Sequence, residues 1–248
     1  MSENSGHDKD SMRSLNVSSF IFGLAFHCSQ VFASPPPPAS EQHYEQARSS
    51  LALAQQMLAD SNGFSAEKLE VVIDNANAEL QKASELGHPA AALYQAQLIL
   101  NMAGGDTEKR NQACALLEYW AERGFVAAAV TNFRKCDRSY LRFDDASPEH
   151  QAALKALSAS LAGSDPAQAY YPFPQDTSQC FAAGSTEIVA LYQGQFRAEA
   201  EYILGSAQQP EDAETAKQLL VWLDASANHG CQMALDPRPY LRKLSGTE

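Results

Sequence analysis

The sequence predicts an all-α fold of antiparallel helical hairpins, stacked as a short, partly degenerate α-solenoid. Hydrophobic residues make up 45% of the 248 positions and charged residues 19%, so the chain is able to bury a core. Alanine is abundant, and apolar residues do not alternate along the chain as they do in half-buried strands. In addition, one pattern of small and apolar residues recurs around three glycines. Together these observations exclude a β-sandwich or barrel and favour closely packed helices.

The recurring pattern is centred on Gly87, Gly124 and Gly230. A leucine stands seven residues before each glycine and an alanine four residues after it: Leu80, Leu117, Leu223, Ala91, Ala128 and Ala234. Residues spaced by three, four and seven share one helical face, and a glycine after the last turn of a helix favours a reversal of the chain. Each segment is therefore predicted to form a helix, a tight turn and a second helix. A weaker copy surrounds Gly163.

Capping and helix-breaking residues predict the elements in order. A first helix covers 41–60 and ends before Ser61-Asn-Gly63. Ser65 caps the second helix, which runs to Leu86, and Pro89 opens a third helix that ends before Gly104-Gly105. The helices expected after these cover 107–123, 125–135, 148–162, 185–204 and 211–229, followed by a segment that Asp236-Pro-Arg-Pro239 interrupts.

Several residues of these hairpins match a known repeat motif. They are Ala83 with Glu85-Leu86-Gly87-His88, Ala121-Glu122-Arg123-Gly124, and Trp222-Leu223. At these positions the sequence resembles the Sel-1-like repeat of secreted bacterial proteins, a subclass of the tetratricopeptide-type α-solenoid. The resemblance is best over 65–136 and 205–244. It implies a helical repeat protein that binds another protein on its concave face.

The amino-terminal residues predict export. Met12-Arg13 precede an apolar run from Val17 to Phe26, which is too short to span a bilayer and is typical of a secretory signal. In Val31-Phe32-Ala33, small residues occupy the two positions that a signal peptidase reads, so we expect cleavage after Ala33. We therefore expect a signal peptide with an upstream tail over 1–33, a stiff proline-rich spacer over 34–40 and a helical repeat domain over 41–248. The mature protein is then periplasmic or secreted; the alternative is a tail with an incidental apolar patch.

Removal of residues 1–33 leaves four cysteines, an even number that favours disulfides in an exported protein. Cys114 lies ten residues before a hairpin turn and Cys136 twelve residues after it, so an antiparallel pair brings them together. Cys180 precedes one expected helix, and Cys231 follows the neighbouring antiparallel helix. We therefore predict the disulfides Cys114–Cys136 and Cys180–Cys231, with free buried thiols as the alternative.

The irregular loop over 165–184 is the segment that stands out for binding. Twenty residues without helical periodicity are unusual inside a repeat domain, and long loops often carry function. Tyr170, Tyr171 and Phe173 lie between prolines and are the candidate partner-binding residues, because rigid aromatics make contacts at low entropic cost. The alternative is that these rings plug a gap between degenerate repeats.

Charge and motifs narrow the classes of function. The net charge is −12, and the sequence lacks the clusters of lysine and arginine that nucleic-acid binding needs, so we expect no nucleic-acid partner. We predict no catalytic, cofactor-binding or metal-ligating residues, since His88 and His229 flank turn glycines and are interpreted as helix-end residues. Ser65-Ala-Glu-Lys68 matches the S-x-x-K of penicillin-recognising enzymes, but no S-D-N or K-T-G follows it. No stable membrane insertion is expected.

The leading hypothesis is a non-catalytic periplasmic scaffold or adaptor of the Sel-1-like type that binds another protein. Stacked hairpins build the extended surfaces that such binding uses. One alternative is suggested by the resemblance: an immunity protein that neutralises a secreted antibacterial effector. A second alternative, from another class, is a hydrolase acting on cell-wall material or β-lactams, with Ser65 as its nucleophile.

Overall fold

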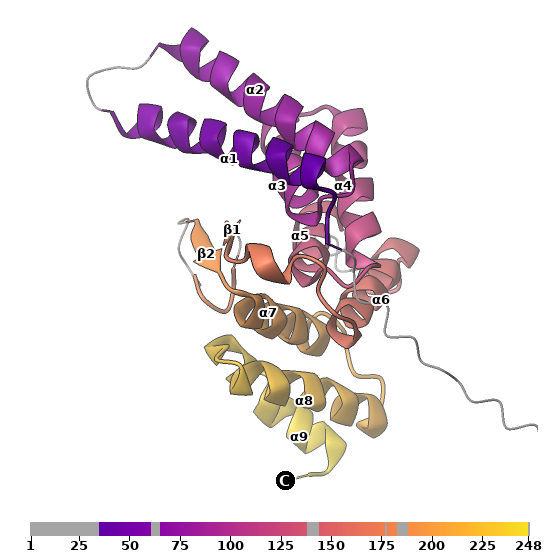
Figure 1. The fold of residues 1–248 in the computed structure, drawn as a ribbon. Helices are drawn as coiled ribbons and strands as arrows, with labels where there is room; N and C mark the ends of the chain where they lie inside the picture. The colour runs from indigo at the N-terminus through magenta and orange to yellow at the C-terminus, as the bar shows by residue number, and fades with distance from the viewer. Residues whose placement is uncertain (1–34, 61–64, 138–143, 177, 183–187, 248) are drawn as a thin grey trace, which may run out of the picture. The chain divides into compact units, whose positions relative to one another are not determined.

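The computed structural model describes residues 35–60, 65–137, 144–176, 178–182 and 188–247. Within these ranges the chain consists mainly of helices that pack against helices, which confirms the all-α class (Figure 1). The predicted signal peptide and its cleavage after Ala33 lie outside the described residues. In the described ranges, no helix combines the length and the apolar character needed to cross a membrane.

The helices begin and end close to the capping residues recognised in the sequence. Ser65 accepts a hydrogen bond from the backbone N–H of Lys68 at the start of the second helix, and Pro89 opens the third. The helical elements are α1 (Pro38–Ala59), α2 (Ala66–Glu85), α3 (Pro89–Met102), α4 (Thr107–Ala121), α5 (Val126–Cys136), α6 (Pro148–Ala162), η2 (Gln168–Tyr170), α7 (Gln193–Ser206), α8 (Ala213–Asn228), η3 (Gln232–Leu235) and α9 (Arg238–Ser245).

Helices stack in the order in which they follow each other along the chain. Each helix from α1 to α8 packs on the next one, and α3 also contacts α5, α4 contacts α6, and α5 contacts α7. Contacts between alternate helices arise when one antiparallel hairpin stacks on another. The pairs α2–α3, α4–α5 and α6–α7 therefore form successive layers, and α8 continues the stack beside α7.

The turn glycines have the conformation that the repeat pattern predicts. Gly87, Gly124 and Gly230 have φ angles of 88°, 92° and 96°, in the left-handed region that other residues avoid. The leucine and alanine of each repeat are all buried, with at most 1% of their surface exposed: Leu80, Leu117, Leu223, Ala91, Ala128 and Ala234. The repeat therefore specifies both the reversal of the chain and the packing of the two helices.

The amino-terminal helix starts earlier than the sequence suggests. The predicted spacer over 34–40 is wrong in its second half, because α1 begins at Pro38. Proline suits the first turn of a helix, where the backbone N–H has no intrahelical partner. The end of the proline run therefore forms the start of α1 instead of an extended spacer before it. The side chain of Ser40 is already buried and donates a hydrogen bond to the carbonyl of Pro37.

The expected loop over 165–184 and helix over 185–204 are partly wrong. The loop contains η2 and a short strand, β1 (Phe173–Gln175), which pairs antiparallel with β2 (Val189–Leu191). Phe173 and Leu191 are opposite each other and fully buried, so this pairing places two apolar side chains in the core. The helix α7 consequently begins only at Gln193, and residues 183–187, including the expected helix start, lie outside the described residues.

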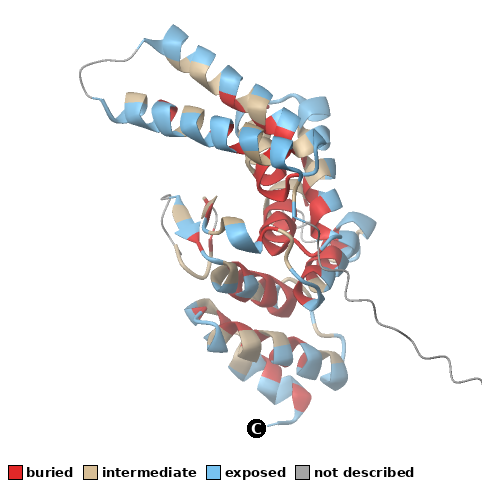
Figure 2. Cartoon of the chain, viewed as in Figure 1, coloured by how far each residue is buried: buried red, intermediate tan, exposed pale blue. Residues whose placement is uncertain are grey.

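The core runs along the stack of helices (Figure 2). Its main cluster extends from Tyr44 in α1 to Leu204 in α7. The carboxyl-terminal end of α1 and the amino-terminal end of α2 are largely exposed. A second cluster joins α7, α8 and α9 around Leu223. Gly205 permits this contact, because a Cβ atom there would lie only 2.6 Å from the Cγ of Leu223.

Candidate partner-binding surface

The three aromatics predicted to bind a partner pack against the helical core. Phe173 has no exposed surface, and its ring contacts those of Phe125 and Tyr171. Tyr170 and Tyr171 are half-buried. This arrangement is the plug that the sequence allows as the alternative to partner binding. Phe173 has no surface to offer a partner, and partner contact through the two tyrosines stays a prediction.

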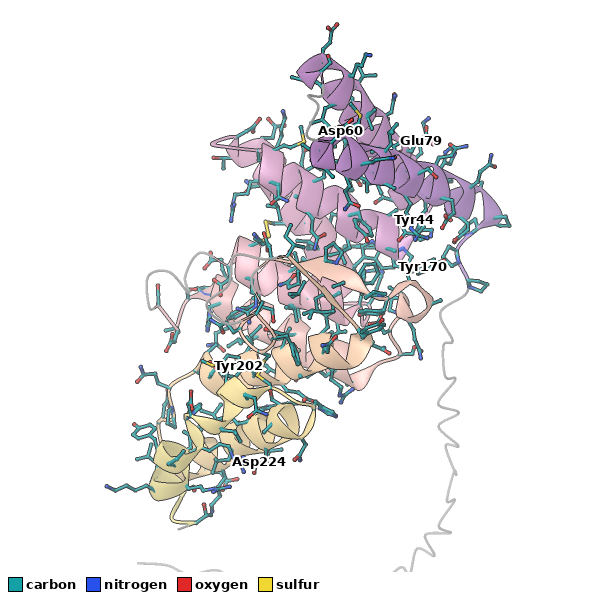
Figure 3. The ribbon with its side chains drawn as sticks, turned by 90° about the vertical axis from the view of Figure 1, so that its left-hand side faces the viewer. Tyr44, Asp60, Glu79, Tyr170, Tyr202 and Asp224 are labelled. Carbon is teal, nitrogen blue, oxygen red and sulfur yellow. A yellow bond between two sulfur atoms is a disulfide. The ribbon has the colours of Figure 1, made fainter. Side chains whose placement is uncertain are left out.

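Tyr170 ties its loop to α1 and α3. Its hydroxyl donates to Oε2 of Glu41 at 2.7 Å, and Nε2 of His88 lies 3.1 Å from the same oxygen. Nδ1 of His88 accepts the backbone N–H of Ala91 at 3.3 Å, so the proton of the neutral ring is on Nε2 and His88 caps α3 as expected. Burial lowers the pKa of His88, while Glu41 acts in the opposite direction. The ring of Tyr44 contacts the rings of His88 and Tyr170, and Figure 3 shows Tyr44 beside Tyr170.

Tyr171 is held by a half-buried carboxylate. Its hydroxyl donates to Oδ2 of Asp165 at 2.6 Å, and Asp165 also accepts the backbone N–H groups of Ala167 at 2.8 Å and Val126 at 3.4 Å. Val126 is the first residue of α5, where N–H groups lack helical partners. Burial raises the pKa of Asp165, and the hydrogen bond from Tyr171 opposes that shift. The loop therefore supplies the amino-terminal cap of α5.

A buried ion pair fastens the next part of the loop. Arg134 in α5 pairs with Glu199 in α7, and their side chains are 9% and 0% exposed. Glu199 also accepts hydrogen bonds from the hydroxyl of Ser178 and, at 2.9 Å, from the backbone N–H of Cys180. Removing one partner of such a pair leaves an uncompensated buried charge. The role of this cluster is consequently to fix the loop between α5 and α7.

Both predicted disulfides are confirmed. Cys114 and Cys136 are bonded with their Cα atoms 5.7 Å apart, and Cys180 and Cys231 with their Cα atoms 4.6 Å apart. The first joins α4 to the end of α5, and the second joins the loop to the residue after the turn that follows α8. The cross-links are compatible with a periplasmic or secreted protein, because disulfides persist in oxidising compartments.

Two surface cavities follow each other along the helical stack. The first, of about 320 Å³, lies between α2, α3 and α4, and the second, of about 330 Å³, lies between α4, α5 and α6. Leu98, Ile99 and Met102 give the first cavity an apolar wall. Ala152 and Ala153 line the second, beside the Cys114–Cys136 disulfide. The helix α4 forms a wall of both cavities.

The two cavities are built from the same positions of the repeat. Counted from the turn glycine, these positions lie ten and six residues before it and eight and twelve residues after it. They are Asn77, Gln81, Gln95 and Ile99 in the first cavity, and Cys114, Glu118, Asn132 and Cys136 in the second. Each hairpin therefore presents one equivalent wall, and the next helix along the chain closes the cavity.

Sequence reasoning missed these cavities. Of the predicted site residues, only Cys114 and Cys136 line one of them. A signal was present in the repeat: the polar Glu118 lies next to Leu117, and the polar Asn132 lies about one helical turn after Ala128, two positions that the pattern places in the core. Sequence motifs do not reveal the cavities, because residues of three separate helices line each of them and form no contiguous motif.

Comparison with known proteins found no match: no protein-family model, no curated protein and no solved structure is similar to this chain. The resemblance to Sel-1-like repeats is therefore an interpretation carried by the residues of the hairpins alone.

Proposed function

We propose that the chain is a non-catalytic scaffold or adaptor of the periplasm or the extracellular space, and that it binds another protein along the face where the two cavities lie. The observation that carries this proposal is the repetition of one cavity in neighbouring hairpins. Two equivalent cavities on neighbouring hairpins suit an extended partner, which places successive side chains in successive cavities.

The chemistry of this face supports a protein partner. Met102 lines the first cavity and is 62% exposed, so it offers a flexible apolar contact. Around it, the amide side chains of Gln81, Gln95 and Gln112 provide donors and acceptors that a polypeptide satisfies. A wall that combines apolar and amide groups resembles the mixed character of protein interfaces more than the charge-dominated surface of a nucleic-acid site.

Site-specific photo-cross-linking in native periplasm tests the proposal. A benzophenone amino acid replaces Gln81 in the first cavity, Ala152 in the second, or Lys217, an exposed residue of α8 that lines neither cavity. We expect one and the same protein to be cross-linked from Gln81 and Ala152 and not from Lys217. Equal labelling from all three positions, or different proteins from the two cavities, would overturn the proposal.

A further inference from the structure

The cavity between α4, α5 and α6 contains carboxylates that lack a cationic partner. Glu118 and Glu149 both line it, and within the described part of the chain neither forms an ion pair. A third lining carboxylate, Asp137, already lies 2.6 Å from Nδ1 of His150. The described lining residues include no lysine or arginine. A cation that enters this cavity consequently meets two carboxylates that form no ion pair with any of the described residues.

A buried amide in the same wall also lacks a partner. Asn132 is 9% exposed and lines the cavity, and its side chain makes no hydrogen bond with the described residues. Since the side-chain carbonyl of asparagine is an acceptor, a ligand that carries N–H donors beside its positive charge satisfies Asn132 and the carboxylates together.

The rest of the wall suits an aliphatic stem. Ala152 and Ala153 of α6 lie on one side, and the Cys114–Cys136 disulfide lies on the other. Arginine and lysine bury their methylene groups along such surfaces while the charged end group stays among polar groups. The lining of the cavity therefore combines apolar groups with carboxylates and an amide.

The chain itself shows which cation these repeat positions accept. Asp224 lies six residues before Gly230 and Arg238 eight residues after it, the positions that Glu118 and Asn132 occupy around their own turn glycine. There the guanidinium of Arg238 forms an ion pair with Asp224 at 2.7 Å (Asp224 is labelled in Figure 3). In the last repeat, the carboxylate thus holds an arginine of its own hairpin.

We infer that the α4–α5–α6 cavity binds the guanidinium group of an arginine side chain presented by the protein partner, an inference that rests on the proposed function. The guanidinium donates to Glu118 and Glu149, and it also donates to Oδ1 of Asn132. Arginine fits better than lysine, because its planar fork of five N–H donors serves several acceptors at once. The chain's net charge of −12 adds a long-range attraction for a basic partner.

The first cavity provides an internal comparison. At the equivalent positions it has the neutral Gln81 and Gln95, and Lys109 of α4 also lines it. Lys109 forms an ion pair with Asp106 at 3.8 Å, and the lining amides carry no negative charge that attracts a second cation. The guanidinium site is therefore specific to the second cavity.

Titration of the full mature chain with short peptides, followed by ¹H–¹⁵N chemical shifts, tests the inference. The probes are Ac-Gly-Gly-Arg-Gly-Gly-NH₂ and the same peptide with lysine or with citrulline, the neutral analogue of arginine. We expect the side-chain amide signals of Asn132 to shift with the arginine peptide, and those of Gln95 to stay unchanged. The citrulline peptide is expected to bind at least tenfold more weakly, and the lysine peptide to lie between the two.

Variants separate the site from general electrostatics. Glu118→Gln with Glu149→Gln is expected to weaken arginine binding at least tenfold, whereas Glu108→Gln with Glu122→Gln changes the net charge equally on residues outside the cavity and leaves most of the affinity. Asn132→Arg is expected to abolish binding by forming the pair seen in the last repeat. Equal binding of arginine and citrulline, or equal losses in the two glutamine pairs, would overturn the inference. This titration needs no natural partner, so it can fail while the cross-linking result for the proposed function stands.

Discussion

Replacement of the turn glycines by alanine tests how the repeat specifies its hairpins. Gly87 and Gly124 occupy the same repeat position and have nearly equal φ angles of 88° and 92°, so an added Cβ meets the same backbone strain at both. Their surroundings differ. A Cβ at Gly87 has no heavy atom within 4 Å, whereas a Cβ at Gly124 lies 2.9 Å from the carbonyl oxygen of Ser164. The pair of variants therefore separates conformational strain from steric overlap.

The expected magnitudes follow from these two contributions. The left-handed conformation costs an alanine about 1–2 kcal/mol, and the stiffer unfolded chain returns about 0.4–1 kcal/mol. Gly87→Ala is therefore expected to lower the free energy of unfolding by about 1 kcal/mol. At Gly124 the overlapping atom belongs to the backbone and cannot rotate away, which adds about 1–3 kcal/mol. Gly124→Ala is therefore expected to cost about 2–4 kcal/mol.

Urea denaturation followed by circular dichroism measures both values. Gly105→Ala is the control, because a Cβ at this exposed glycine meets no atom within 4 Å and the left-handed region is not required there. We expect its unfolding midpoint to rise slightly, because only the stiffer unfolded chain contributes, by about 0.4–1 kcal/mol. If Gly87→Ala and Gly124→Ala lost the same stability, the contact with Ser164 would carry no energy. If Gly87→Ala had the same stability as the Gly105→Ala control, the left-handed turn would be refuted.

Further tests concern the disulfides, the buried histidine and the loop. Replacement of both Cys114 and Cys136 by serine opens a cross-link that spans 22 residues, so the unfolding free energy is expected to fall by about 3 kcal/mol in urea denaturation. Because burial lowers the pKa of His88 from 6.5, the unfolded chain binds a proton more readily; stability is present above pH 6.5 and decreases as the pH falls. His88→Asn is expected to flatten this acid-side decrease between pH 7 and 5, and an unchanged slope would contradict the assignment. Tyr171→Phe removes the donor to Asp165 and is expected to lower the free energy of unfolding by about 1.5–3 kcal/mol, measured by thermal or urea denaturation. An unchanged stability would show that this hydrogen bond is absent.

The parts of the fold that the sequence predicts are those with a local physical cause. Ser65 and Pro89 mark helix starts because capping and a fixed φ angle act within one helical turn. The Cys114–Cys136 bond is predictable for a related reason: similar distances from one turn, ten and twelve residues, determine which residues of an antiparallel pair meet. In each case, the sequence distance between the interacting groups is short or is set by a single hairpin.

The aromatic loop illustrates why the rest escapes prediction. The hydrogen bond from Tyr170 to Glu41 joins residues 129 positions apart, and the ion pair of Arg134 with Glu199 joins residues 65 apart. Neither contact leaves a periodic signal, because each depends on how three or more helices come together. The same composition of tyrosines and prolines suits an exposed binding loop and a buried plug. Only the tertiary contacts distinguish them.

In each repeat, one position is buried in the core and the next position lines the candidate site or its equivalent. The residue seven before each turn glycine is a buried leucine, and the next residue is rotated by about 100° around the helix, toward the groove. That next residue is Gln81, Glu118 or Asp224 in the three hairpins, and the residue eight after the glycine is Gln95, Asn132 or Arg238. The core positions are the same in all three hairpins, whereas the neighbouring positions differ. They are neutral in the first hairpin, they include the acidic Glu118 in the second, and in the third the acidic Asp224 pairs with Arg238. The leucine and the alanine are buried in all three hairpins, so under the proposed function the variable groove residues are the ones expected to select a partner.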